Sequence, residues 1–560
     1  MKSDITRDTF VAGKHFSRVI RQQGRVDLDA DTNEQTSILL HYLRTLALDL
    51  IGPYAAPVMA AGFRLSKDTN DSLSISAGRY YVDGYLVENE TSCLYTEQPN
   101  NPLPNDDPFA KALIDKLDAL YWVYLDVWER HVTSIEDDSI REKALGGPDT
   151  CSRAQVAWQV RALDVGDTAR KDMRDKRREW LTNKLTTLQT QLSNASSNLT
   201  KAKLQQEIDK VNDQLAIVDR PEPKDLAAGC PYPLDFLLPL SDAMMGARVD
   251  PGAKIADACV MSPDSKFTGR ANQLYRVEVH RGGIVGEATI KWSRDNGSRA
   301  AAWTNSAGFD LEVANARDFV AGNWVELTDD VSDLRGLPGV LARLTKVEGA
   351  NLSVDPDSVG GDPNAIHWNN DLINPKIRRW DHFETEDTVI EDDGSILIKE
   401  TPIGTNDDTA AWMDLEDGIQ IQFAAGGEYR TGDYWLIPAR VATGNIEWPE
   451  PESDTIAKFT ALLEPNGVVH HYAPLGFVNW PNGAIQIESC NCEFEPLSSC
   501  FSSGSVAVAA SLLRNGQLLF REDRQRTKPA PARRVQTSTT TTDRTPTKTA
   551  PRRSTKKGGT

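Results

Sequence analysis

Residues 72–90 read SLSISAGRYYVDGYLVENE, and apolar residues alternate with polar ones on both sides of Asp83-Gly84. Such a period of two predicts strands with one buried face. An Asp-Gly pair between two alternating runs is a strong signal for a two-residue hairpin turn. Residues 119–130 (ALYWVYLDVWER) and 155–163 (QVAWQVRAL) read as two further strands. The N-terminal part of the chain therefore predicts antiparallel β-structure.

The pattern of strands and tight turns returns between about residues 272 and 520. Asn-Gly or Asp-Gly pairs stand at Asn296-Gly297, Asp393-Gly394, Asp417-Gly418, Asn466-Gly467, Asn482-Gly483 and Asn515-Gly516. Regular turn signals of this kind favour antiparallel sandwich or barrel-like domains. The predicted fold class is mainly β with α insertions, with an N-terminal amphipathic helix and an inserted helical hairpin.

The N-terminal helix is predicted from a capping box and a leucine stripe. Thr32 and Gln35 stand at the capping-box spacing, and Gly52-Pro53 should end the helix after about five turns. The candidate docking residues on this helix are Ile38, Leu39, Leu43, Leu46 and Leu50.

Asp27, Asp29 and Asp31 precede this helix at alternate positions and resemble the start of a calcium loop. A calcium loop of the helix-loop-helix kind needs Gly at its sixth position and Glu at its twelfth. Those positions hold Thr32 and Ile38. Aspartates beside a helix N-terminus are favoured by the helix dipole, so we interpret the three as helix-end residues rather than metal ligands.

Residues 170–219 predict an antiparallel helical hairpin, because apolar residues repeat at 4-3-4 spacing on both sides of a Ser/Asn-rich turn. Either the hairpin projects as a coiled coil or its helices pack on the body. The candidate seam residues are Leu181, Leu185, Leu188, Leu192, Leu204, Ile208, Val211 and Leu215.

Five segments follow from these patterns. They are an N-terminal arm and docking helix (1–52), a β-rich attachment domain (53–163), the inserted hairpin (164–222), a large β-rich domain (223–520) and a disordered basic tail (521–560).

Charge divides the chain sharply. The tail, 521–560, holds 12 Lys or Arg against 3 Asp or Glu and carries +9, whereas the first 520 residues hold 50 against 78 and carry −28. The acidic body argues against nucleic acid as a partner. The tail, poor in apolar residues, should stay disordered. It is a candidate tether to an anionic membrane surface, through Arg533, Arg534, Arg552, Arg553, Lys556 and Lys557.

The chain carries seven cysteines, an odd number that predicts no disulfide framework. We therefore expect synthesis in a reducing cytoplasm, and the chain has neither a signal-peptide pattern nor a run long enough to span a bilayer. By residue type, Cys490, Cys492 and Cys500 with His470 and His471 could form a zinc site. Their spacing is not a standard zinc one, and neighbouring strand residues point to opposite faces.

Catalytic motifs are absent from the sequence, so no cofactor is implied and we expect a protein without enzymatic activity. Acidic pairs at Asp329-Asp330, Asp392-Asp393 and Asp407-Asp408 leave a glycosidase as an alternative. The 13 tryptophans leave a glycan-binding face as another. Packing in the core is their default role. The tryptophans in strand-like contexts are Trp122, Trp128, Trp158, Trp292, Trp303, Trp324, Trp412 and Trp435.

Several stretches in a fixed order resemble a bacterial family of uncharacterised proteins found with phage-tail-like contractile injection systems. They are HFSRVIRQQGRVDLDADTNEQ (15–35), SAGRYYVDGYLVE (76–88), ALGGPDT (144–150), GRANQLYRVEVH (269–280), IKWSRDNGS (290–298), GNWVELTDD (322–330), GGEYRTGDYWLIPARVATGNIEWP (426–449) and HHYAPL (470–475). The first two also look like the start of phage baseplate and tail-fibre-attachment proteins.

This resemblance implies a structural subunit at the baseplate of a contractile particle or in a fibre-like extension of it. It implies copies of the chain and other baseplate or tail proteins as partners, and an N-terminal helix that docks onto neighbouring subunits. It brings no catalytic residues. The expected location is a phage-tail-like particle assembled after cytoplasmic synthesis, with a membrane surface as a further partner of the tail. A tail-spike-like glycan-degrading enzyme and a free-standing glycan-binding module are the rival functions.

Overall fold

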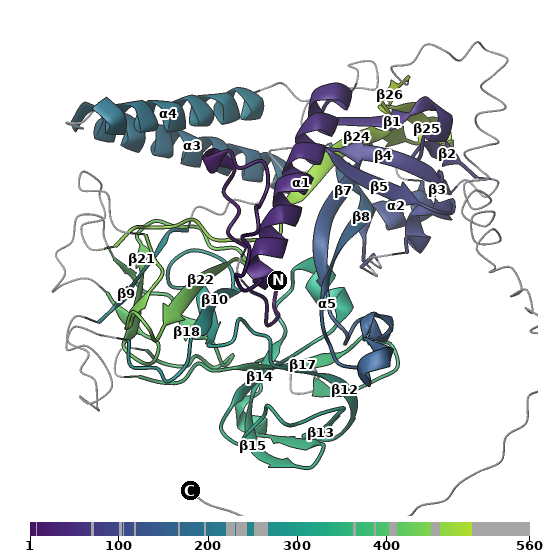
Figure 1. Ribbon diagram of the computed structural model, residues 1–560. Helices are drawn as coiled ribbons and strands as arrows, with labels where there is room; N and C mark the ends of the chain where they lie inside the picture. Colours follow the sequence, from purple (N-terminus) through teal and green to yellow (C-terminus); the bar gives the residue numbers. More distant parts are fainter. Residues whose placement is uncertain are drawn as a thin grey trace, which may run out of the picture. The chain divides into compact units, whose positions relative to one another are not determined.

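The structure is a computed structural model of the 560-residue chain (Figure 1). It describes residues 1–495 except 7, 69–71, 100–102, 105, 117–118, 166–167, 195–197, 220–229, 231–242, 251–266, 362–365, 386–387, 402–410 and 450–459.

The described part of the chain is mainly β-structure with a few helices, as predicted. Its strands form several sheets and one closed barrel, and their apolar side chains gather in three large buried cores. The predicted turns contribute directly. Asp83 and Gly84 join two strands with positive φ angles of 46° and 81°, and Asn296 and Gly297 do the same with 53° and 60°. Both residues of a type I′ turn require positive φ, which favours these residue types.

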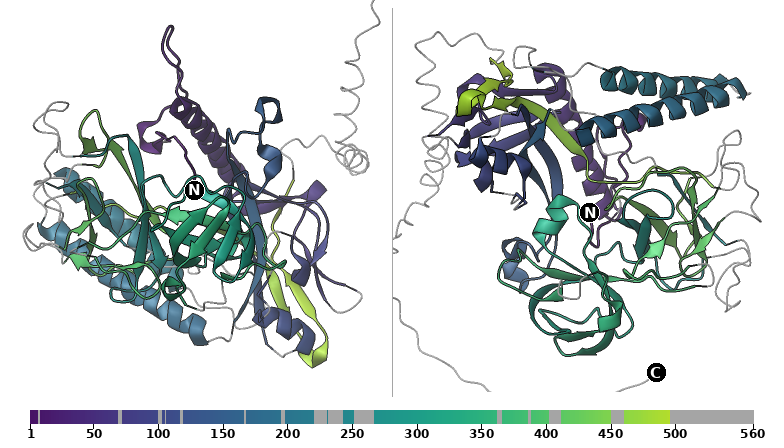
Figure 2. Two further views of the ribbon diagram at one scale, coloured as in Figure 1. Left: turned by 90° about the horizontal axis from the view of Figure 1, so that it is seen from below. Right: turned by 180° about the vertical axis from the view of Figure 1, so that it is seen from behind.

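The first core combines the N-terminal strands with the last described ones. β7 pairs with β8 along its whole length and with β24 on its other side, while β26 pairs in parallel with β1. Figures 1 and 2 show these late strands, in yellow-green, beside the purple and blue strands of the N-terminal part.

The elements of the first core are β1 (Tyr54–Pro57), β2 (Leu65–Lys67), β3 (Leu73–Ile75), β4 (Gly78–Val82), β5 (Tyr85–Asn89), β6 (Cys93–Leu94), α2 (Pro108–Asp115), β7 (Tyr121–Val132), β8 (Arg153–Asp164), β24 (His470–Asn479), β25 (Gln486–Ser489) and β26 (Glu493–Phe494).

The second core lies between a five-stranded sheet, ordered β18-β11-β10-β22-β23, and a smaller sheet around β21. Its strands are β9 (Met245–Val249), β10 (Gln273–Arg281), β11 (Thr289–Ser293), β18 (Ile396–Leu397), β19 (Glu400–Thr401), β20 (Met413–Asp414), β21 (Ile419–Ala424), β22 (Tyr434–Arg440) and β23 (Asn445–Ile446).

The barrel forms the third core and closes in the order β12-β13-β16-β15-β14-β17. The short helix α5 (Asp330–Arg335) follows β14. The strands are β12 (Ala300–Ala307), β13 (Asp310–Val313), β14 (Trp324–Thr328), β15 (Val340–Glu348), β16 (Asn351–Val354) and β17 (Lys376–Trp380). The segment predicted as one large domain, 223–520, thus holds two separate cores and lends its late strands to a third.

The N-terminal helix α1 runs from Asp29 to Ile51. It ends as predicted, since Gly52 adopts a positive φ of 91° and donates its N–H to the carbonyl of Leu48. The predicted capping box is wrong, because the helix starts four residues earlier and its N-cap, Leu28, has no capping side chain. Asp29 and Asp31 lie in the first turn, where their negative charge faces the positive end of the helix dipole.

The helices α3 (Thr168–Asn194) and α4 (Asn198–Val218) lie side by side as a hairpin (Figure 1). As far as the side chains here are described, their apolar cluster consists of residues of these two helices, with Leu181, Val211 and Val218 buried. Ile208 is also buried, and Leu185, Leu188, Leu192, Leu204 and Leu215 are half-buried. The hairpin therefore buries its own seam.

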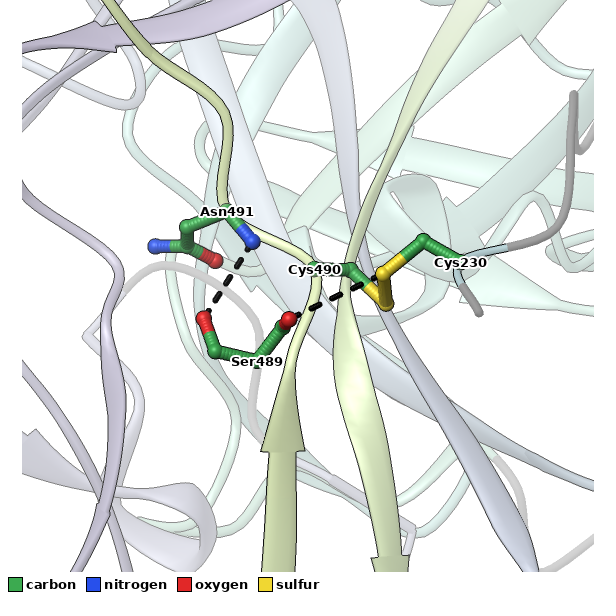
Figure 3. The surroundings of a disulfide bond; sticks show 4 residues. All are labelled: Cys230, Ser489, Cys490 and Asn491. Carbon is green, nitrogen blue, oxygen red and sulfur yellow. Dashed lines mark hydrogen bonds between the residues drawn. A yellow bond between two sulfur atoms is a disulfide. The ribbon is translucent and has the colours of Figure 1, made fainter. Parts of the chain in front are cut away.

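A disulfide joins Cys230 to Cys490 across 260 residues of sequence (Figure 3). Cys490 follows β25 and packs with Trp122, Tyr124 and Phe477. The sequence-based expectation of no disulfide framework missed this pair, because two cysteines so far apart in sequence meet only in the folded chain. Cys93, Cys151 and Cys492 are free.

Candidate functional sites: a helix face and a polar cavity

Leucines form an exposed stripe along α1. The side chains of Leu39, Leu43, Leu46 and Leu50 are all more than half exposed, and Leu43 reaches 62%. Ile38, predicted together with them, is fully buried. Successive helix residues are rotated by about 100° around the axis, so Ile38 faces the protein while its neighbour Leu39 faces outward.

The exposed apolar surface extends onto the arm that precedes the helix. About half of the exposed large apolar side chains among the described residues fall between Val11 and Leu50. Those on the arm are Val11, Phe16, Ile20, Val26 and Leu28, and those on the helix beyond the stripe are Leu40, Tyr42 and Leu48. A concentration of this kind marks an interaction surface.

Polar contacts fix the helix to the first core and the arm to the helix. Arg44 donates to the hydroxyl of Tyr85 at 2.9 Å and to Glu129 at 2.7 Å. Gly84 of the β4–β5 turn lies so close to the Arg44 carbonyl that a Cβ would collide with it. On the arm, the N–H of Val19 donates to Gln35 at 2.9 Å. The stripe is thus displayed on a helix that is held in place.

A cavity of about 720 Å³ is lined by residues of all three cores. The strands β7, β10, β14 and β17 each present charged side chains to the cavity, so its lining is strongly polar. Two clusters of charged side chains dominate, the inner wall and the Lys376 wall. The inner wall comprises Lys2, Arg276, Glu278, Lys291, Glu326 and Arg378. The Lys376 wall comprises Lys376, Glu136, Asp330 and Asp333.

Glu278 lies at the centre of the inner wall. It pairs with Lys2 at 2.7 Å, Arg276 at 2.6 Å and Lys291 at 3.4 Å. Burial alone would raise the pKa of Glu278, but the surrounding cations hold it well below its usual range. Lys291 also pairs with Glu326, which accepts a 2.9 Å hydrogen bond from the indole of Trp380.

Lys376 lies at the centre of the Lys376 wall. It pairs with Glu136 at 2.6 Å, Asp330 at 3.3 Å and Asp333 at 2.7 Å. Burial opposes the ionised form of Glu136, but Lys376 and Thr133 outweigh it and lower the Glu136 pKa to about 2. The same carboxylates raise the pKa of Lys376 above its ordinary value despite its burial. Lys376 and Glu136 therefore both stay charged at neutral pH.

The residues predicted as zinc ligands do not come together. Cys490 is in the disulfide, His470 contacts Asp126 at 2.7 Å, and His471 contacts Asp83 at 2.9 Å. The two histidines thus face different partners, as expected for neighbours on a strand. Cys500 lies outside the described residues.

The predicted acidic pairs and tryptophans have structural roles where they are described. Asp329 caps α5 by accepting the N–H of Ser332, Asp330 pairs with Lys376, and Asp393 pairs with Arg281. Seven of the eight tryptophans named above are buried; Trp412 is half-buried beneath Arg248. Asp407-Asp408 and the six tail residues from Arg533 to Lys557 lie outside the described residues.

Sequence reasoning missed the cavity. Several of its charged residues come from strand segments, such as GRANQLYRVEVH and GNWVELTDD. Charged residues inside such apolar runs were the available signal, because they are seldom buried without partners.

A family model described as a family of unknown function (DUF6519) matches residues 1–557. The chain belongs to this family. No curated protein matches the sequence. Among solved structures, the crystal structure of TssK matches at 11% identity, covering 65% of this chain and 98% of that chain, with a TM-score of 0.14. A score that low supports no argument about fold or function. In the described part of the chain, no helix is long and apolar enough to cross a bilayer.

Proposed function

We propose that this member of the DUF6519 family is a non-enzymatic structural subunit of a phage-tail-like contractile particle, at its baseplate or in a fibre-like extension. The single observation that carries the proposal is the exposed leucine stripe of α1, fixed to the body by Arg44. The stripe indicates that the chain assembles with a partner. The ordered motifs quoted above resemble proteins found with phage-tail-like contractile systems, and this resemblance is the reason for proposing such a particle.

The occupant of the stripe is a second copy of this chain. Leu39, Leu43, Leu46 and Leu50 repeat at 4-3-4 spacing, the pattern that packs against an identical stripe in a coiled coil. The four positions carry no charge that would select a charged partner. Copies related by symmetry present the same stripe to one another.

The size of the surface agrees with a stable contact. A standard interface takes roughly 20–30 residues from each partner, and a little over half of its area is apolar. The exposed apolar side chains between Val11 and Leu50 number about a dozen and can supply that apolar share.

The test is the mass of the purified chain by light scattering coupled to size-exclusion chromatography. The wild-type protein should be an oligomer, and the double variant L43E/L46E should be a monomer with unchanged circular dichroism. Thr45→Glu adds one negative charge at an exposed position on another side of the helix, and it should leave the oligomer intact. A wild-type monomer, or a double variant that still assembles, contradicts self-association.

Membership of a particle needs a separate measurement. Affinity purification of the chain from its own cells should recover sheath and baseplate proteins, identified by mass spectrometry. A monomer that hydrolyses a polysaccharide would instead establish the tail-spike-like alternative.

A further inference from the structure

The inner wall of the cavity carries more positive than negative charge. Its four basic residues are Lys2, Arg276, Lys291 and Arg378, and its two acidic residues are Glu278 and Glu326. All but Lys2 are at least nine-tenths buried. Buried charges are stable when they are paired, so the surplus on this wall needs an explanation, above all in a chain whose first 520 residues carry −28.

The two carboxylates are already fully used by three of the cations. Glu278 contacts Lys2, Arg276 and Lys291. Glu326 contacts Lys291, the indole of Trp380 and, at 3.2 Å, the N–H of Gly339. A carboxylate offers about four acceptor sites, so little capacity remains for another cation.

Arg378 is the cation left over. It lies on β17, lines the cavity and is 6% exposed. One of its terminal nitrogens donates to the carbonyl of Gly297. Its Nε has no hydrogen-bond partner, and none of its nitrogens is within ion-pair distance of a carboxylate in the described part of the chain. A buried guanidinium with unused donors is a site for a planar anion such as carboxylate or phosphate.

Two further donors line the same cavity. Nε2 of His131 on β7 is buried and also lacks a partner among the described residues. Burial and nearby cations lower the His131 pKa to about 4, so the imidazole is neutral and can donate one N–H. Arg430, half-buried, makes one long contact of 3.5 Å with the carbonyl of Val468.

We infer that the cavity is a binding site for a small anionic molecule, whose phosphate or carboxylate group is held at the inner wall by Arg378. The volume of about 720 Å³ is within the range of small-molecule sites and leaves room for a polar body beyond the anionic group. Tyr85, Trp128 and Tyr434 line that remaining space. This site is independent of the proposed assembly through α1.

The test is isothermal titration calorimetry of the full chain with inorganic phosphate and, separately, with citrate as a carboxylate probe. Each titration is paired with sodium chloride at matched ionic strength, because unspecific screening acts on all exposed charges. Phosphate or citrate should bind with one site per chain and raise the melting temperature above that in chloride. Which probe binds more tightly identifies the anionic group.

Arg378→Gln should weaken binding at least about tenfold, because it removes a charge-assisted fork of donors. If this buried substitution prevents folding, the half-buried Arg430→Gln should still weaken binding about threefold. Lys346→Gln removes an exposed cation that pairs with Glu348 outside the cavity, and it should leave affinity unchanged. Equal affinity in all three variants, or no binding of either probe beyond the chloride effect, overturns the inference.

Discussion

The guanidinium group of Arg44 on α1 lies 2.7 Å from the carboxylate of Glu129 on β7 and stacks 3.8 Å above the ring of Tyr85 on β5. One side chain thus joins the exposed helix to two strands of the first core. The stripe on α1 can serve as a docking surface only while this attachment holds, since a free helix with many exposed leucines would collapse or aggregate.

Replacing Arg44 by Met should therefore loosen α1. We expect the free energy of unfolding to fall by about 1–3 kcal/mol, because a half-buried charge-assisted bond and a cation–π contact are lost together. Urea unfolding measures this, and limited proteolysis should show earlier cleavage within 29–51. The matched control is Arg21→Met, whose partner Asp27 is exposed and whose loss should cost under about 1 kcal/mol. Equal effects of the two variants would contradict a special role for Arg44.

The hairpin should be removable. Among the residues that the structure describes, its apolar cluster holds side chains of α3 and α4 only, so we expect the β-cores to stay covered when 168–218 is replaced by a short Gly/Ser linker. We expect soluble protein with the strand signal of circular dichroism retained and a single unfolding transition. A companion variant, Leu181→Asp in the intact chain, should melt the hairpin alone, because Leu181 is fully buried in its seam. Loss of all soluble protein on deletion would show that the hairpin supports the cores.

The disulfide should stabilise the chain measurably. Closing a loop of 260 residues restricts the unfolded chain, and removal of such a bond costs about 2–5 kcal/mol. Cys230→Ser should lower the urea midpoint under oxidising conditions and have no effect in the presence of a reductant. Cys151→Ser, at an exposed free cysteine, is the control. Peptide mapping without reduction tests the pairing itself, and alkylation of both Cys230 and Cys490 in untreated protein would refute it.

Stability should fall as the pH drops from 6.5 toward 4. Burial lowers the pKa of His382 to about 4, of His131 to about 4 and, with help from Lys291, of His280 to about 3. The unfolded chain binds protons at these groups below pH 6.5 while the folded chain does not. Each histidine therefore removes up to about 1.4 kcal/mol per pH unit in this window. Glu136 contributes only below about pH 4.5, because there the unfolded chain protonates this carboxyl while the folded chain, in which its pKa is about 2, does not.

The measurement is urea unfolding at pH 7, 6 and 5. In His382→Gln, the unfolded chain should bind about one proton fewer over this pH range, so the decline of stability with falling pH should be shallower. Gln can still donate to the Gly394 carbonyl that His382 contacts at 2.8 Å. His15→Gln, at an exposed residue, should leave the slope unchanged. A pH-independent midpoint in the wild type would contradict this, because it would show that the three histidines take up protons over the same pH range in the folded and the unfolded chain.

Local signals in the sequence were enough to predict strands, turns and helices. The alternation around Asp83-Gly84 and the apolar run at 119–130 depend only on residues that are close in sequence. They can therefore be recognised without knowing the fold. The same holds for Gly52, whose positive φ ends α1, and for the 4-3-4 repeats of the hairpin. The start of α1 was missed because Asp29 and Asp31 belong to the first turn of the helix. The capping-box pattern at Thr32 and Gln35 had indicated a start after these two aspartates.

Only the tertiary structure decided what these elements meet. β24 pairs with β7 more than 300 residues earlier, and Cys230 reaches Cys490, because non-local contacts depend on chain folding rather than on neighbouring residues. The cavity arises in the same way. Lys2 lies in the N-terminal arm, whereas Glu278, Lys291 and Arg378 lie on three different strands. They are scattered along the chain and look like ordinary charges, and their burial together creates the inner wall. The sequence by itself determined the class of fold and the leucine repeat of α1, while the fold determined that Ile38 is buried and Leu43 exposed.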